Sequence, residues 1–231
     1  MSNDILYEGR EYLVAFLRGK ANDLETRHPW RREWQHIVLH SLRVESYVVR
    51  LLEEEPHSLT ESERRSLRLA AILHDIGRLE KTENHATTGA EIVGMWFRAD
   101  PLRRLPLVEV QRVVELIADH SNKDRNDSDF SKAVLKDADI LDEVGAMSIF
   151  MAGNWLDTGS PFFFYDLRQR LLEVEIPFCD QQLSRLRTAA AKKLLNDKKA
   201  FVENFIAQMG DELRSEVHVE RLLLARRKIT R

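Results

Sequence analysis

Apolar residues recur at helical spacing along most of this chain. Between about Ile5 and Lys20, and again over a longer segment from Trp30 to Glu54, they fall three or four positions apart, which places them on one face of an α-helix. The same pattern predicts central helices over residues 60–75, 85–99 and 106–120. The chain is therefore expected to fold as a bundle of helices.

Capping and turn-forming residues set the boundaries of these helices. Thr60-Glu61-Ser62-Glu63 has the sequence of a capping box, and Gly77 is expected to stop the helix that this box opens. Residues 121–130 have the composition of a polar loop. A single helix is predicted to follow from Ser131 to about Met151, with two or three more over residues 162–231.

Composition supports an all-α fold and narrows the class of protein. Nine Gly and six Pro are few for 231 residues, whereas the helix formers Leu, Ala, Glu and Arg are abundant. The net charge of −3 argues against a dedicated nucleic-acid binder. The single Cys179 excludes an internal disulfide and a cysteine-based zinc cluster. Neither a signal peptide nor a membrane-spanning run is visible, so a cytoplasmic protein with no membrane partner is expected.

The pair His74-Asp75 ends an apolar helical run and is the first candidate for chemistry. A charge beside Ile72 and Leu73 is costly to bury unless something pairs with it, and a divalent cation can pair with both side chains at once. The alternative is that Asp75 simply ends the helix and His74 is a satisfied core histidine.

His40 is the preferred first partner of this doublet. His36 and His40 are four positions apart and share a helix face. The Glu that a zincin helix needs is absent, because Ile37 follows His36. We therefore assign His40 as a ligand, and His36 either as a neighbour that supports it or as an ordinary helix histidine.

An acidic cluster supplies the second partner. Asp139 and Asp142 share a helix face by their spacing, whereas Asp137 points elsewhere, and core-type residues flank all three. A cation is the simplest source of counter-charge for such a cluster, the alternative being a solvated acidic face. His85 and His120 lie at helix boundaries. Each alone is typical of a surface histidine, but together with the others they suit one or two borderline divalent metals.

These residues resemble the HD-domain superfamily of metal-dependent phosphohydrolases, in the form of its small stand-alone bacterial members. The family pattern is a histidine, a His-Asp doublet and a distal aspartate on a compact helical core, and it covers roughly residues 28–150 here. The adjacent second histidine of the cyclic-dinucleotide-degrading branch is absent, because Ser121 follows His120, and the Gly-Tyr-Pro signature of that branch is also missing. The ordered series in this chain is His40, His74, Asp75 and Asp139, with His85 and His120 in place of the extra ligands of dinuclear members.

The resemblance implies a compact HD-domain helical bundle with additional C-terminal helices. Residues 1–27 would form an N-terminal helix packing on the core, residues 28–155 the metal-binding core, and residues 156–231 a C-terminal extension. Asp139 is preferred to Asp137 as the distal ligand because it precedes Ile140-Leu141-Asp142.

The implied activity is hydrolysis of a phosphate ester, a nucleotide being one candidate, by metal-activated water. One or two divalent ions are expected, with Mn, Fe, Mg, Co, Ni and Zn left open, and Asp75 would bridge two ions. Arg78 and Lys123 are candidate phosphate clamps or ordinary solvated charges, and Arg43 is expected to pair with an acidic residue near the site.

Three alternatives remain open from the sequence. A di-iron oxygenase of the HD type would use all six ligands, and a non-catalytic ligand-binding module would keep only the fold. The basic stretch Arg226-Arg227-Lys228 could bind nucleic acid, although Leu222-Leu223-Leu224 favour a packing helix or a homodimer through the C-terminal helices. The expected partner is a small phosphorylated substrate, with no specific nucleic acid.

Overall fold

The computed structural model describes residues 4–21, 32–80, 83–99, 105–124, 128–214, 221–223 and 225–226, and its regular structure is helical throughout these residues. This confirms the all-α prediction. No helix in the described part is long and apolar enough to span a bilayer. The elements in chain order are α1 (Ile5–Leu17), α2 (Trp34–Glu54), α3 (Glu61–Leu73), α4 (His85–Ala99), α5 (Leu107–Asp119), α6 (Phe130–Asp142), α7 (Ala146–Gly153), α8 (Phe163–Arg170), the π-helical segment η2 (Leu171–Glu175), α9 (Ile176–Arg185) and α10 (Ala189–Glu212).

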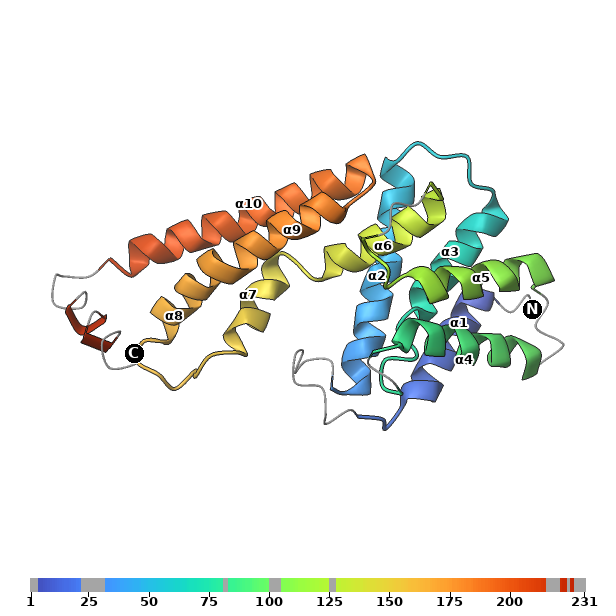
Figure 1. Ribbon diagram of the computed structural model, residues 1–231, viewed down its shortest axis with the longest axis horizontal. Coiled ribbons are helices and arrows are strands. Elements are labelled where there is room, and N and C mark those ends of the chain that lie inside the picture. The colour runs from blue at the N-terminus through green and yellow to red at the C-terminus, as the bar shows by residue number, and fades with distance from the viewer. Residues whose placement is uncertain are drawn as a thin grey trace.

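The helices form two lobes (Figure 1). Helices α1 to α6 gather into a bundle, and α7 to α10 extend from it as an elongated arm, in which α8 and α9 follow each other along one line and α10 runs beside them. The main hydrophobic core lies in the bundle and takes in the first part of α10, whereas a second cluster of buried side chains joins α7, α8, η2 and the latter part of α10. The division into segments 1–27, 28–155 and 156–231 stays a prediction.

Helix α3 is the centre of the bundle and packs against α1, α2, α5 and α6. Its last residues, Ala70, Ala71, Ile72 and Leu73, are fully buried, because they face neighbouring helices on every side. The predicted capping box is present: the Thr60 hydroxyl accepts from the Glu63 backbone N–H, and the Glu63 carboxylate accepts from the Thr60 backbone N–H. The helix that ends in the His-Asp doublet is thus fixed at its start and along its length.

A buried carboxylate ties the first three helices together. Glu45 on α2 accepts from Arg10 on α1 at 2.6 Å and from Arg68 on α3 at 2.9 Å. Because Glu45 is buried and both guanidinium groups are half-exposed, the charges are paired without being wholly removed from water. This network fixes α1 against the α2–α3 pair.

The prediction of a single helix from Ser131 to about Met151 is wrong, because the chain bends between α6 and α7. Gly145 has φ 105°, a backbone conformation that residues with a side chain rarely adopt, and it precedes the first residue of α7. The Lys198 ammonium, from α10, donates to the carbonyl oxygens of Leu141 and Val144 at the end of α6. The bend turns α7 away from the bundle and into the arm.

Other boundaries differ in smaller ways. The segment predicted to be helical from Trp30 begins at Trp34, and residues 30 and 31 lie outside the described part of the chain. Between α8 and α9 the helix widens into η2, just before Pro177. Proline has no N–H to donate and its ring clashes with the carbonyl of the preceding turn, which accounts for a wider turn at this point.

At the C-terminus, only part of the basic stretch and of the leucine run before it is described. Arg226 donates to the Asp166 carboxylate at 2.8 Å and lies over the Phe162 ring, so this residue packs against the arm. Arg227, Lys228 and Arg231 lie outside the described residues, as does Leu224. A homodimer through the C-terminal helices stays a prediction.

Gly77 serves a different purpose from the one predicted. Helix α3 ends at Leu73, four residues earlier, and Gly77 is not among the glycines with positive φ. A Cβ atom there would collide with the backbone carbonyl of His85 and lie 2.6 Å from the backbone nitrogen of Gly89. The absence of a side chain lets the turn after the doublet press against the start of α4.

We expect Gly77→Ala to lower the free energy of unfolding by about 2 kcal/mol or more, because backbone atoms on both sides would have to move. Gly94→Ala on α4 is the matched control, since its new Cβ would meet the flexible end of Arg98 at 3.4 Å and a methyl group of Val114 at an ordinary contact distance of 4.0 Å. That change should be neutral or should stabilise the helix by about 0.5–1 kcal/mol. Urea denaturation followed by circular dichroism measures both, and equal stability of the two variants would contradict this account of Gly77.

Candidate metal centre

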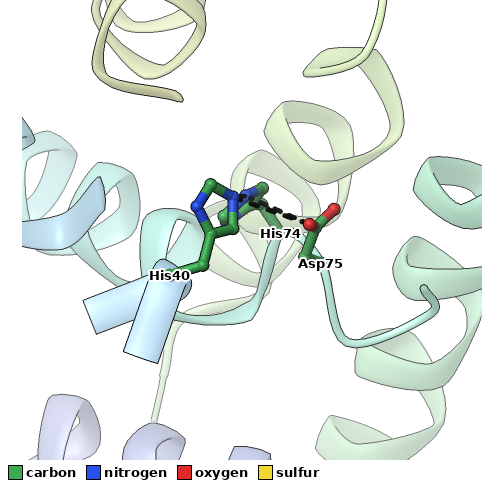
Figure 2. Close-up of side chains that lie close together, drawn as sticks. All are labelled: His40, His74 and Asp75. Atoms are coloured by element: carbon green, nitrogen blue, oxygen red, sulfur yellow. Dashed lines mark hydrogen bonds and ion pairs between the residues drawn. The ribbon is translucent and has the colours of Figure 1, made fainter. Parts of the chain in front are cut away.

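Six buried side chains from five helices meet at one point in the bundle. His74 lies at the end of α3 and is followed by Asp75 in the next turn, and both are fully buried. The others are His40 in α2, His85 at the start of α4, His120 at the end of α5, and Asp139 in α6. Figure 2 shows the side chains of His40, His74 and Asp75 pointing toward one another. All six predicted ligands are therefore neighbours.

One half of this site gathers around His40. Its Nε2 atom lies 3.2 Å from Nε2 of His74, 3.2 Å from Oδ1 of Asp139 and 3.6 Å from Oδ2 of Asp75. Nε2 of His74 lies 3.9 Å from the same Asp75 oxygen and 3.8 Å from Asp139. Two imidazoles and two carboxylates thus face one small volume.

The other half gathers on the opposite oxygen of Asp75. Oδ1 of Asp75 lies 3.3 Å from Nε2 of His85 and 3.5 Å from Nε2 of His120. The two histidine nitrogens are themselves 3.2 Å apart. Asp75 therefore stands between two histidine pairs and offers one oxygen to each.

Hydrogen bonds made by the Nδ1 atoms of His74 and His120 show which ring nitrogen carries a hydrogen in each case. Nδ1 of His74 lies 2.8 Å from the carbonyl oxygen of Ala71, and Nδ1 of His120 lies 2.7 Å from that of Ile117. A carbonyl can only accept, so each Nδ1 carries a hydrogen, and either ring would bind a metal ion through the lone pair of Nε2. Lone-pair nitrogens facing one another and carboxylates repel unless a proton or a metal cation lies between them.

The pKa values of the histidines reflect the same crowding. Burial lowers the pKa of His74 to about 3, against the opposing pull of Asp75 and Asp139, so this ring is neutral. Burial also acts to lower the pKa of His40, but Asp139, Asp142 and Asp75 outweigh it and raise that pKa to about 9. The carboxylates around His40 thus draw a positive charge to this position.

The donor set suits a divalent metal ion of borderline character. Among the described residues, three overlapping groups of buried side chains could hold an ion. Imidazole nitrogens with hydrogen-bonded far sides and carboxylate oxygens are the ligands that such metals take in proteins. The groups are His40, His74 and Asp75; His74, His120 and Asp139; and Asp75, His85 and His120.

Comparison with known families identifies the domain that carries this site. The model of the HD domain matches residues 37–144, the span that supplies all six side chains. Residues 37–144 form an HD domain. No curated protein matches it at a significant level.

Solved structures share the fold over nearly the whole chain. A predicted HD-superfamily hydrolase from an uncultured Thermotogales bacterium is 19% identical, with a TM-score of 0.61 over 90% of this chain and 93% of its own. An HD-superfamily hydrolase from Bacillus thuringiensis is 21% identical, with a TM-score of 0.62 over 92% and 98%. Bacillus subtilis YpgQ, solved in complex with ADP, is 17% identical, with a TM-score of 0.57 over 91% and 98%. The likeness therefore extends beyond the HD domain to the C-terminal arm.

Each buried carboxylate of the HD site has a basic partner at the edge. Arg78 donates to Asp75 at 3.1 Å, and Lys123 lies 3.0 Å from Asp139 and 3.4 Å from Glu143. Burial alone would raise the pKa of Asp75 and of Asp139. Arg78 and Lys123, together with the histidines, hold both pKa values well below the usual range. Both carboxylates are consequently ionised and already balanced, so a bound divalent ion would give the site excess positive charge.

Asp137 and Asp139, the two candidates for the distal ligand, have different surroundings in the structure. Asp137 accepts from the backbone N–H groups of Arg187 and Thr188 and from the Thr188 hydroxyl, so it holds the start of α10 and not the HD site. Asp139, two residues later, faces His40. His36 is exposed one turn before His40 and belongs to none of the three groups.

Asp142 is a site residue to which the sequence analysis gave no role. It accepts from Nδ1 of His40 at 2.7 Å and from Arg43 at 2.7 Å, which is the acidic partner expected for Arg43. The three-residue spacing from Asp139 placed Asp142 on the same face, but only the packing of α6 against α2 brings it to the far side of the His40 ring. A carboxylate at this position orients the imidazole and makes it a stronger base.

We expect Asp142→Ala to weaken metal binding by about 10- to 100-fold while the helical content is retained, because His40 loses the group that orients its ring. Competition with a chromogenic chelator measures the affinity, and circular dichroism checks the fold. Asp180→Ala removes an exposed aspartate of α9 that pairs with Lys199, and it serves as the control. Unchanged affinity in Asp142→Ala would show that His40 needs no such support.

Proposed function

We propose that this HD-domain protein is a metal-dependent phosphohydrolase that cleaves a phosphate ester, with a nucleotide as the leading candidate substrate. The observation that carries the proposal is Asp75, whose two oxygens face two separate histidine pairs inside a buried site. The neighbouring structure from Bacillus thuringiensis is an HD-superfamily hydrolase, that from the uncultured Thermotogales bacterium is a predicted one, and YpgQ was solved with ADP. These relatives support hydrolysis as the reaction and a nucleotide as the ligand.

His40, His74, Asp75 and Asp139 would hold the first metal ion. His85 and His120 would hold a second, with Asp75 bridging the two. A divalent ion at this position lowers the pKa of bound water and offsets negative charge on phosphoryl oxygens. This ligand set can bind Mn, Fe, Mg, Co, Ni or Zn. Elemental analysis of the purified protein is therefore needed to identify the metal.

The remaining roles fall to the basic side chains at the edge of the site. Arg78 and Lys123 are mostly buried and hold Asp75 and Asp139 in their ionised forms, which are the forms that ligate a cation. Both side chains carry several N–H donors, so each can donate to a phosphate oxygen while keeping its carboxylate. We assign Asp75, Arg78 and Lys123 as the catalytic residues on this basis.

The first prediction from this proposal concerns the doublet. His74→Ala and Asp75→Ala should each abolish bound metal and hydrolysis, because each removes a ligand that the site has no means of replacing. Helical content should stay near that of the wild type. His36→Ala should keep its full metal content, since His36 is exposed and outside the ligand groups. Elemental analysis and circular dichroism provide the readouts, and full activity in Asp75→Ala would contradict the mechanism.

The second prediction concerns the metal itself. Chelation should abolish hydrolysis of a panel of nucleoside mono- and triphosphates, cyclic nucleotides and an aryl phosphate, and one or more of Mn, Mg, Co, Ni and Fe should restore it. The six side chains would also serve the di-iron oxygenase alternative, so the panel is run with and without oxygen. Turnover that depends on oxygen and iron would show that the protein is an oxygenase and not a hydrolase. Activity that survives chelation would exclude both of these assignments.

A further inference from the structure

A large cavity opens beside the candidate metal centre, between the HD bundle and the arm. Its volume is about 490 Å³, and it is lined by α2, the end of α6, α7 and the two residues after it, the end of α8, η2 and α9. His40, Arg43 and Asp142 belong to the lining and also to the metal centre. Of the six candidate ligands, His40 is the one that belongs to this lining, so the cavity meets the metal centre at the His40 ring.

The wall contributed by the arm is apolar and aromatic. Phe150 is 79% exposed and Trp155 43% exposed, and Met147 and Val174 also expose large parts of their side chains there. Phe178 from α9 lines the same wall. Exposed apolar side chains gathered in one concave place indicate a binding surface, because leaving them in water has a free-energy cost.

Two charged groups of the wall have hydrogen-bonding capacity left over. Nε of Arg170 is buried and has no hydrogen-bond partner among the described residues, and its guanidinium lies 5.5 Å from the centre of the Trp155 ring. Arg170 approaches the Glu175 carboxylate only to 3.8 Å. Burial raises the pKa of Glu175 against the weaker opposing effect of Arg170. Arg170 and Glu175 both line the cavity and keep 26% and 14% of their side chains exposed, so their outer N–H groups and carboxylate oxygens can pair with polar groups of a ligand there.

We propose that this cavity binds the nucleobase of a nucleotide whose phosphates lie at the metal centre, an inference that rests on the proposed function for the position of the phosphates. Trp155 provides the stacking surface, and Glu175 and Arg170 pair with the polar edge of the base. The volume lies within the range of sites that bind small molecules and cofactors. A planar heteroaromatic group with donors and acceptors on its edge matches this wall better than an acyl chain, which would leave both charged groups unpaired.

Equilibrium binding to the metal-loaded protein tests the stacking surface without relying on turnover. The probes are ADP and inorganic pyrophosphate, which carries two linked phosphates without the ribose and the base. Wild-type protein should bind ADP about tenfold or more tightly than pyrophosphate, and Trp155→Ala should lose most of that difference while its affinity for pyrophosphate changes less than twofold. Phe201→Ala removes an aromatic residue of α10 that is also half-exposed but does not line the cavity, and should leave both affinities unchanged.

The outcomes separate this inference from the proposed function. Undiminished ADP affinity in Trp155→Ala overturns the inference, even if the protein hydrolyses phosphate esters. An equal loss of affinity for ADP and for pyrophosphate also overturns it. A change of oligomeric state in Trp155→Ala overturns it as well, because the wall would then be an interface between copies of the chain. Loss confined to ADP supports the inference, even if no substrate on the panel is hydrolysed and the proposed function fails.

Glu175→Gln tests how the edge of the base is recognised. A carboxylate accepts from an exocyclic amino group, whereas an amide both donates and accepts. The variant should therefore weaken ADP and CDP relative to UDP by about fivefold or more, with pyrophosphate unaffected. An unchanged order of the three nucleotides would exclude Glu175 from base recognition.

Discussion

The repulsion among inward-facing lone pairs and carboxylates is the constraint on which this structure depends. The backbone carbonyls of Ala71 and Ile117 fix a hydrogen of His74 and of His120 on the outward nitrogens, so the inward nitrogens are the ones that can ligate a cation. Asp75 and Asp139 add negative charge to the same buried volume. The proton that His40 holds through its raised pKa lies among these groups, Arg78 and Lys123 pair with the two carboxylates, and a bound metal ion would take the place of that proton.

Most of the histidines of the site are held at the ends of helices. His74 and His120 are C-terminal caps, and His85 begins α4, so three of the four imidazoles sit where a helix starts or stops. Gly77 allows the turn after the doublet to lie directly on α4, which brings His85 to Asp75. Only His40 and the distal aspartate lie within helices, and the packing of α2 against α6 brings these two together.

The two lobes contribute different parts of the candidate site: the bundle contributes the charged groups, and the arm contributes the aromatic wall. Arg78, Lys123 and Arg43 each neutralise one carboxylate of the bundle, which favours an anion once a metal ion is added. The arm supplies the aromatic wall, because the bend at Gly145 turns α7 and the residues after it alongside the mouth of the site. The phosphate would be recognised by the bundle and the rest of the substrate by the arm.

Local features of the sequence were enough to predict the helices, the capping box and the set of six candidate ligands. Helical periodicity and side-chain chemistry are properties of neighbouring residues, so a single sequence carries them. The bend at Gly145 was missed, because a glycine in an otherwise apolar helical run is compatible with helix until Lys198, more than fifty residues later, fixes the carbonyls before it. The separation of Asp137 from Asp139, the contact of Asp142 with His40 and the wall around Trp155 were likewise decided only by tertiary structure. Each depends on which faces of distant helices meet, and that is determined by packing over the whole chain and not by the spacing within any one segment.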